Sequence, residues 1–102
     1  MPESVEGWAT MPLPDLMAKV EATSVSLSNK IQEHAADEGA YQRKFWTTWQ
    51  ELPEDWSVAA ANRECERQCK GLDEERILSR ALVESLTVKR DSMVAILEAR
   101  SR

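Results

Sequence analysis

The apolar residues between positions 13 and 52 recur every seven residues, a pattern typical of a long amphipathic helix. Two interleaved series carry the pattern, at alternating spacings of three and four. The first series is Leu13, Val20, Leu27, His34, Tyr41 and Thr48, and the second is Met17, Ser24, Ile31, Glu38, Phe45 and Leu52. Most of these residues are apolar, so we expect them to form a seam, the stripe along which one helix packs on another. The pattern predicts a helix over about residues 14–50.

A turn is expected after this helix. Pro53 cannot lie in a helix interior because it lacks a backbone N–H, so residues 51–56 predict a turn. Ser57 is a suitable N-cap, and Trp56 stands where an apolar residue can staple the incoming chain to the first helical turn. A second helix is expected over about residues 57–99. Its predicted seam is Val58, Cys65, Leu72, Ser79, Leu86 and Met93.

Gly71 is the position at which the second helix could break, since Gly-Leu-Asp could end one helix and cap another at Asp73. An interior glycine costs only about 1 kcal/mol relative to alanine, which packing can offset. We therefore predict a continuous helix, with a kink at Gly71 as the alternative.

Two long helices joined by a short turn fold back on one another, so the sequence predicts an all-α, antiparallel helical hairpin over residues 14–102. Residues 1–13, with several prolines and acids, predict an extended N-terminal arm. The second helix also has apolar residues away from its seam, although a helix with one neighbour needs only one stripe. We predict a homo-oligomer, such as a four-helix bundle or a larger assembly, with these residues in its interface. They are Ile77, Ala81, Val88 and Ala95.

Charge narrows the choice of partner. The chain of 102 residues has a formal net charge of −5, and residues 1–40 hold seven acidic residues against two basic ones. Affinity for duplex nucleic acid comes chiefly from neutralising phosphates, so generic DNA binding is disfavoured. The sequence has no apolar run long enough for a membrane span, and residues 1–14 lack the features of a signal peptide. A cytoplasmic location is expected, with Cys65 and Cys69 as free thiols.

Candidate chemistry is sparse. His34 is the only histidine, and the sequence has no glycine-rich phosphate loop and no motif of paired carboxylates, so we predict neither an enzyme nor a cofactor. Cys65 and Cys69 lie four residues apart, but a structural zinc site usually needs four ligands, so no metal site is expected. These cysteines are interpreted as small buried side chains. A redox role or an intermolecular disulfide is the alternative.

Residues 41–57 hold five of the six aromatic residues. Tyr41, Phe45 and Trp49 recur every four residues and predict packing at the hairpin tip. Trp46 points about 100° away from Phe45, so we expect it to be exposed or in an interface. A protein-binding surface is predicted here. Its residues are Arg43, Lys44, Trp46, Trp49 and Trp56.

The alternative for this region is single-stranded nucleic acid, stacked on Trp46 and Trp49 beside Arg43 and Lys44. The acids Glu51, Glu54 and Asp55 would repel phosphate and disfavour it.

Several segments resemble small helical proteins of tailed bacteriophages, over roughly residues 38–102. They are Ala40-Tyr-Gln-Arg-Lys-Phe-Trp46, Ser57-Val-Ala-Ala-Ala61, Ala81-Leu-Val-Glu-Ser-Leu86, Lys89-Arg90 and Leu97-Glu-Ala-Arg-Ser-Arg102. The genes of those proteins often lie among recombination, replication or early genes. The resemblance implies an accessory protein of the host-cell cytoplasm that binds a replication or recombination factor or a host-defence component. A structural or assembly adaptor of the virion is a further interpretation.

Overall fold

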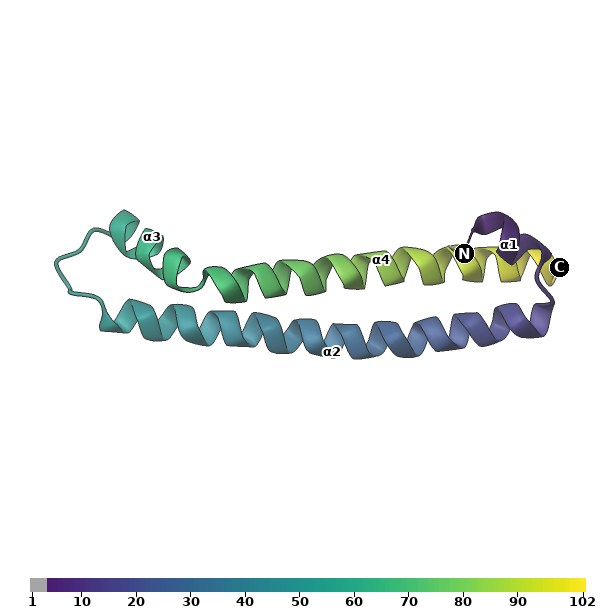
Figure 1. Ribbon diagram of the computed structural model, residues 1–102, viewed down its shortest axis with the longest axis horizontal. Coiled ribbons are helices and arrows are strands. Elements are labelled where there is room, and N and C mark those ends of the chain that lie inside the picture. The colour runs from purple at the N-terminus through teal and green to yellow at the C-terminus, as the bar shows by residue number, and fades with distance from the viewer. Residues whose placement is uncertain (1–3) are drawn as a thin grey trace. The chain divides into compact units, whose positions relative to one another are not determined.

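The structure is a computed structural model that describes residues 4–102, and all regular structure within them is helical. The protein is an all-α antiparallel helical hairpin, as the sequence predicts (Figure 1). The helices are α1 (Val5–Thr10), α2 (Leu13–Glu51), α3 (Val58–Gln68) and α4 (Lys70–Arg100). The chain divides into two compact units, which are described separately. One holds the residues up to Ile31 together with Leu82–Arg102, and the other is Gln32–Ala81.

In the first unit, the short helix α1 buries Trp8 against Leu16 and Met93. Ser4 caps α1 by accepting a hydrogen bond from the Gly7 N–H at 3.1 Å. Arg100 Nη1 donates to the Trp8 carbonyl at 2.8 Å and so joins α1 to the end of α4. Partly buried apolar residues complete this core. They are Met11, Val20, Ile96 and Leu97.

This core corrects the expected extended arm over residues 1–13. Residues 5–10 are helical, because Ser4 supplies a cap and because burying Trp8 stabilises the helix against α2 and α4. Residues 1–3 of the predicted arm lie outside the described residues.

The seam of α2 also differs from the predicted one in this unit. Leu16 and Thr23 are buried, whereas Met17 is 57% exposed and Ile31 is also exposed. The second predicted series is therefore displaced by one residue here. The cause is α1. Leu16 packs with both Trp8 of α1 and Met93 of α4, so packing against α1 decides which residue of α2 faces inward. Leu27, from the first series, is buried as expected.

In the second unit, the aromatic residues of α2 form a row along the helix. Ring centroids are 5.9 Å apart for Tyr41 and Phe45, and 6.4 Å apart for Phe45 and Trp49. All three rings are partly buried, and Thr48 beside them is buried. The packing predicted for these three residues is therefore present.

The second long helix is interrupted, contrary to the predicted continuity, and the interruption lies at Cys69 rather than at Gly71. Cys69 has φ −95° and ψ 6°, between α3 and α4. Hydrogen bonds of 2.9 Å from Cys69 N to Cys65 O and from Asp73 N to Cys69 O span it, so the interruption is a local kink. Gly71 falls in the first turn of α4, where a poor helix former lowers the stability of the helix least. Burial holds the side chains of Cys65 and Cys69 in place.

Cys65 and Cys69 are free and fully buried. Burial raises the pKa of both thiols, and the neighbouring thiol adds to the effect at Cys65. We predict that a thiol reagent such as Ellman's reagent labels the folded protein at least about tenfold more slowly than the unfolded protein near pH 8, because thiolate fraction and access both fall. Denatured protein, with two reactive thiols, is the control. Immediate labelling of both thiols in the folded protein would contradict this burial.

Candidate docking groove at the hairpin tip

The loop of residues 52–57 joins α2 to α3 and is fixed by local hydrogen bonds. Leu52 N donates to Trp49 O at 3.3 Å, and Trp56 N donates to Pro53 O at 3.2 Å. Ser57 Oγ accepts from Ala60 N at 3.1 Å, which confirms Ser57 as the N-cap of α3. The turn chemistry expected from the sequence therefore positions the start of α3.

An open groove of about 390 Å³ lies at this tip. Six of its eight lining residues have apolar side chains, and two of these remain accessible: Val58, at the start of α3, is 67% exposed, and Trp56, in the loop before α3, is 42% exposed. Figure 1 shows α3 leaving the direction of α4 at the kink and diverging from the end of α2. The lining residues are Trp49, Gln50, Leu52, Pro53, Glu54, Trp56, Val58 and Ala61.

This geometry corrects the expected role of Val58. Val58, the first residue of the predicted seam, is 67% exposed and lines the groove, whereas Ala61 and Cys65 further along α3 are buried. Trp56 and Ala61, the pair expected to form a hydrophobic staple, both line the groove. Trp56 keeps enough exposed surface to contact a partner.

Acidic residues lie at this groove and beside it. Glu54 is exposed and lines the groove, Asp55 follows it and is exposed, and Glu51 is exposed but lines a second groove. No lysine or arginine occurs in the sequence between Lys44 and Arg63. The tip therefore combines an apolar floor with negative charge.

Arg43 and Lys44 line a different groove, of about 450 Å³, on the second unit. Its remaining lining residues are small or polar apart from the acid Glu51. Lys44 also acts on Cys69, because its charge lowers the pKa of that thiol and partly offsets the larger effect of burial. The full lining is Ala40, Arg43, Lys44, Thr47, Thr48, Glu51 and Gln68.

Trp46 lines neither groove and is 63% exposed. Residues two apart on an α-helix point about 200° apart, so Lys44 and Trp46 lie on opposite sides of α2. The five residues predicted to bind a partner are thus divided. Trp49 and Trp56 share the tip groove, Arg43 and Lys44 share the polar groove, and Trp46 stands apart.

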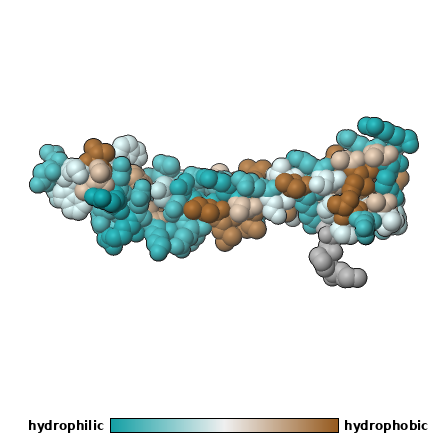
Figure 2. Space-filling view, turned by 90° about the horizontal axis from the view of Figure 1, so that it is seen from above, coloured by the Kyte–Doolittle hydropathy of each residue, from teal (hydrophilic) through white to brown (hydrophobic). Residues whose placement is uncertain are grey.

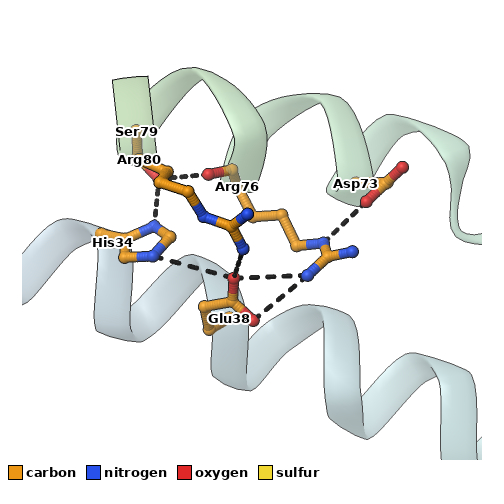
Figure 3. A network of polar contacts seen from close by, with 6 residues as sticks. All are labelled: His34, Glu38, Asp73, Arg76, Ser79 and Arg80. Carbon is orange, nitrogen blue, oxygen red and sulfur yellow. Dashed lines mark hydrogen bonds and ion pairs between the residues drawn. The ribbon is translucent and has the colours of Figure 1, made fainter. Parts of the chain in front are cut away.

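A second polar feature joins α2 to α4 within the same unit (Figure 3). Arg76 Nε donates to Asp73 at 2.7 Å, and its Nη1 lies 3.3 and 3.4 Å from the two Glu38 carboxylate oxygens. Arg80 Nη2 donates to Glu38 at 3.1 Å, and the Arg76 guanidinium lies 4.0 Å from the centre of the Tyr41 ring. Burial would raise the pKa of the Glu38 carboxyl, but the Arg80 hydrogen bond and the Arg76 charge outweigh it and hold that pKa below its ordinary value.

His34 and Ser79 extend this network. His34 Nδ1 lies 2.9 Å from Ser79 Oγ, and His34 Nε2 lies 3.7 Å from Glu38. The Ser79 hydroxyl also lies 3.1 Å from the Arg76 carbonyl, and which of His34 Nδ1 and Ser79 Oγ donates to the other depends on the tautomer of the ring. His34 and the buried Ser79 therefore form a polar layer in the seam between α2 and α4.

His34, Glu38 and Ser79 lie at seam positions predicted from the sequence, but their connection through Arg76 and Arg80 was not predicted. A signal was present, since polar residues at seam positions of both helices need partners. Pairing them required the register of α2 against α4, which periodicity alone does not supply.

The four residues predicted for an oligomer interface are all exposed on α4. Ile77 and Ala81 belong to the second unit, and Val88 and Ala95 belong to the first. Figure 2 shows apolar side chains interrupting the hydrophilic surface at several places. Their exposure leaves them available to a partner, and the oligomer stays a prediction.

Within residues 4–102, no helix has the length and apolar character needed to cross a membrane. The same residues contain no group of three or more His, Cys, Asp or Glu side chains arranged to hold a metal ion. Comparisons with known protein families, curated proteins and solved structures find no match.

Proposed function

We propose that this protein acts by binding another protein, and that the groove at the hairpin tip is the docking site. The observation that carries the proposal is an open groove lined mainly by apolar side chains, of which Trp56 and Val58 remain accessible. Tryptophan is enriched among interface residues whose truncation costs most binding energy. Covering Trp56 and Val58 with a partner would remove apolar surface from water, which favours association.

The identity of the partner is proposed on the resemblance to phage proteins. On that basis the protein is a non-enzymatic accessory protein of the host-cell cytoplasm, and its target is a replication or recombination factor or a host-defence component. The exposed residues Ile77, Ala81, Val88 and Ala95 support self-association, which would also suit an adaptor of virion assembly. The accessory protein would meet its partner through the tip groove, and the adaptor would use the exposed residues of α4.

The arrangement favours a protein partner over single-stranded nucleic acid. A stacking site needs aromatic rings and basic groups along one path. Lys44 and Trp46 lie on opposite sides of α2, while Arg43 lies about 60° from Trp46 on the helix. The groove that holds Trp49 and Trp56 is lined by the acid Glu54 and by no basic residue, so the two tryptophans that lie together have no basic group beside them in that groove.

Replacing Trp56 with alanine is expected to weaken partner binding by about 2–4 kcal/mol, roughly 30-fold to 1,000-fold in Kd. The measurement is an affinity pull-down from phage-infected cells with quantitative mass spectrometry, followed by titration of the purified partner. Trp46→Ala is the matched control, because it removes an exposed tryptophan that lines neither groove, and it should bind as the unaltered protein does. A partner retained equally by both variants would show that the groove is not the docking site.

A further inference from the structure

We infer, resting on the proposed function, that the tip groove takes a cationic segment of the partner protein that inserts one large apolar side chain beside Trp49 and Trp56. The apolar side chains that line the groove favour a large apolar side chain as the anchor. The negative charge around the groove favours basic residues on either side of that anchor.

Negative charge gathers at the tip groove. Glu54 lines the groove and Asp55 follows it, both are exposed, and no basic residue is among the lining residues. Glu51 is also exposed, but it lines the other groove together with Arg43 and Lys44. The end of α2 adds the partial negative charge of a helix C-terminus and has no basic residue in its last turn. The start of α3 offers the opposite partial charge, but the two full charges of Glu54 and Asp55 outweigh it. Lysine or arginine beside the anchor would therefore be attracted, and acids would be repelled.

The size of the groove sets the form of the anchor. A volume of about 390 Å³ is at the lower end of the range of roughly 300–1,000 Å³ found for small-molecule sites. It accommodates one large side chain or two smaller ones, and not a whole helix face. The partner thus presents a short segment, with one apolar anchor between basic residues.

A second copy of the chain does not meet these requirements through its own tip. Two tip grooves brought together would place Glu54 and Asp55 of one copy near the same carboxylates of the other. The self-association proposed for the exposed face of α4 uses other residues and leaves the groove free.

The test begins with a displayed library of random peptides selected on the full-length protein and counter-selected on Trp56→Ala. Synthetic peptides from the selection are then titrated by fluorescence anisotropy in three versions. One keeps the enriched sequence, one replaces its apolar anchor with alanine, and one replaces its basic residues with glutamate. We expect enrichment of Lys or Arg with one large apolar residue, and at least about tenfold weaker binding for the two altered peptides.

Two further measurements separate the charge from the anchor. The double variant Glu54→Gln, Asp55→Asn should bind the basic peptide several-fold more weakly and with a reduced dependence on salt, because exposed charges act at long range and are screened. Trp56→Ala should weaken binding at every salt concentration. Equal binding of the neutral or acidic peptide overturns the cationic segment and leaves the docking site in place.

Other outcomes are equally decisive. If no enriched peptide requires Trp56, the inference is overturned, and the proposed function is judged by the pull-down alone. If light scattering shows that Trp56→Ala dissociates an oligomer, the occupant of the groove is a second copy of this chain, which also overturns the inference.

Discussion

Replacing Leu16 with alanine is expected to lower the free energy of unfolding by about 2–5 kcal/mol, the range typical of a fully buried leucine. Leu16 is fully buried and packs with Trp8 of α1 and Met93 of α4. Truncation would leave a cavity where three helices meet and would loosen α1. The measurement is urea unfolding followed by circular dichroism, together with the thermal midpoint.

Met17→Ala is the matched control for this variant. Met17 is the next residue along α2 and is 57% exposed, so its truncation should cost less than about 1 kcal/mol. The two variants together test which residue faces the core. A larger loss for Met17→Ala than for Leu16→Ala would mean that the register predicted from the sequence is correct and that α1 does not dock as described.

This pair of residues also shows how far periodicity can predict the fold. The seven-residue repeat correctly places Leu27, Cys65 and Met93 in the interior. It cannot choose between adjacent apolar residues such as Leu16 and Met17, because both lie within the width of a helical stripe. The choice depends on the contact with Trp8, and nothing in the repeat of α2 predicts that α1 covers Leu16.

The kink illustrates a different limit. Local propensity points to Gly71 as the weak position, whereas the interruption lies at Cys69. A buried cysteine has no intrinsic tendency to end a helix, so the position depends on tertiary packing. The exposure of Val58 at the other end of α3 likewise could not be predicted from its place in the seam.

Parts of the candidate docking groove were predictable because they depend on short-range chemistry. Pro53 and Ser57 define the turn and the cap from their own backbone requirements. The separation of Lys44 from Trp46 also follows from helical geometry, at about 100° per residue. The contact of Arg76 with Glu38 was not predictable in this way, since it depends on the register between two helices far apart in sequence.

Replacing Arg76 with alanine is expected to lower the free energy of unfolding by about 2 kcal/mol, a value typical of hydrogen bonds to charged groups at a partly exposed site. The variant loses the contacts of the guanidinium with Glu38, Asp73 and the Tyr41 ring. Urea unfolding at neutral pH measures the loss.

Arg67→Ala is the control, because the Arg67 side chain also pairs with an acid three residues earlier, Glu64, but makes that contact within α3 at an exposed position. Exposed pairs within one helix contribute little, so this variant should lower the free energy of unfolding much less than Arg76→Ala does. Equal losses for Arg67→Ala and Arg76→Ala would mean that the contacts between α2 and α4 add no stability.

The stability difference between Arg76→Ala and the unaltered protein should also depend on pH, with a definite sign. The Glu38 carboxyl has a pKa below its ordinary value of 4.5. Its ionised form is therefore favoured in the folded state, and the stabilisation is complete above the ordinary pKa and is lost as the pH falls through the lowered one. Arg76→Ala removes part of this effect, so the two unfolding free energies should converge as the pH falls below 4.5. A difference that stays constant down to acid pH would assign the role of Arg76 to packing on Tyr41 instead of to its pairing with Glu38.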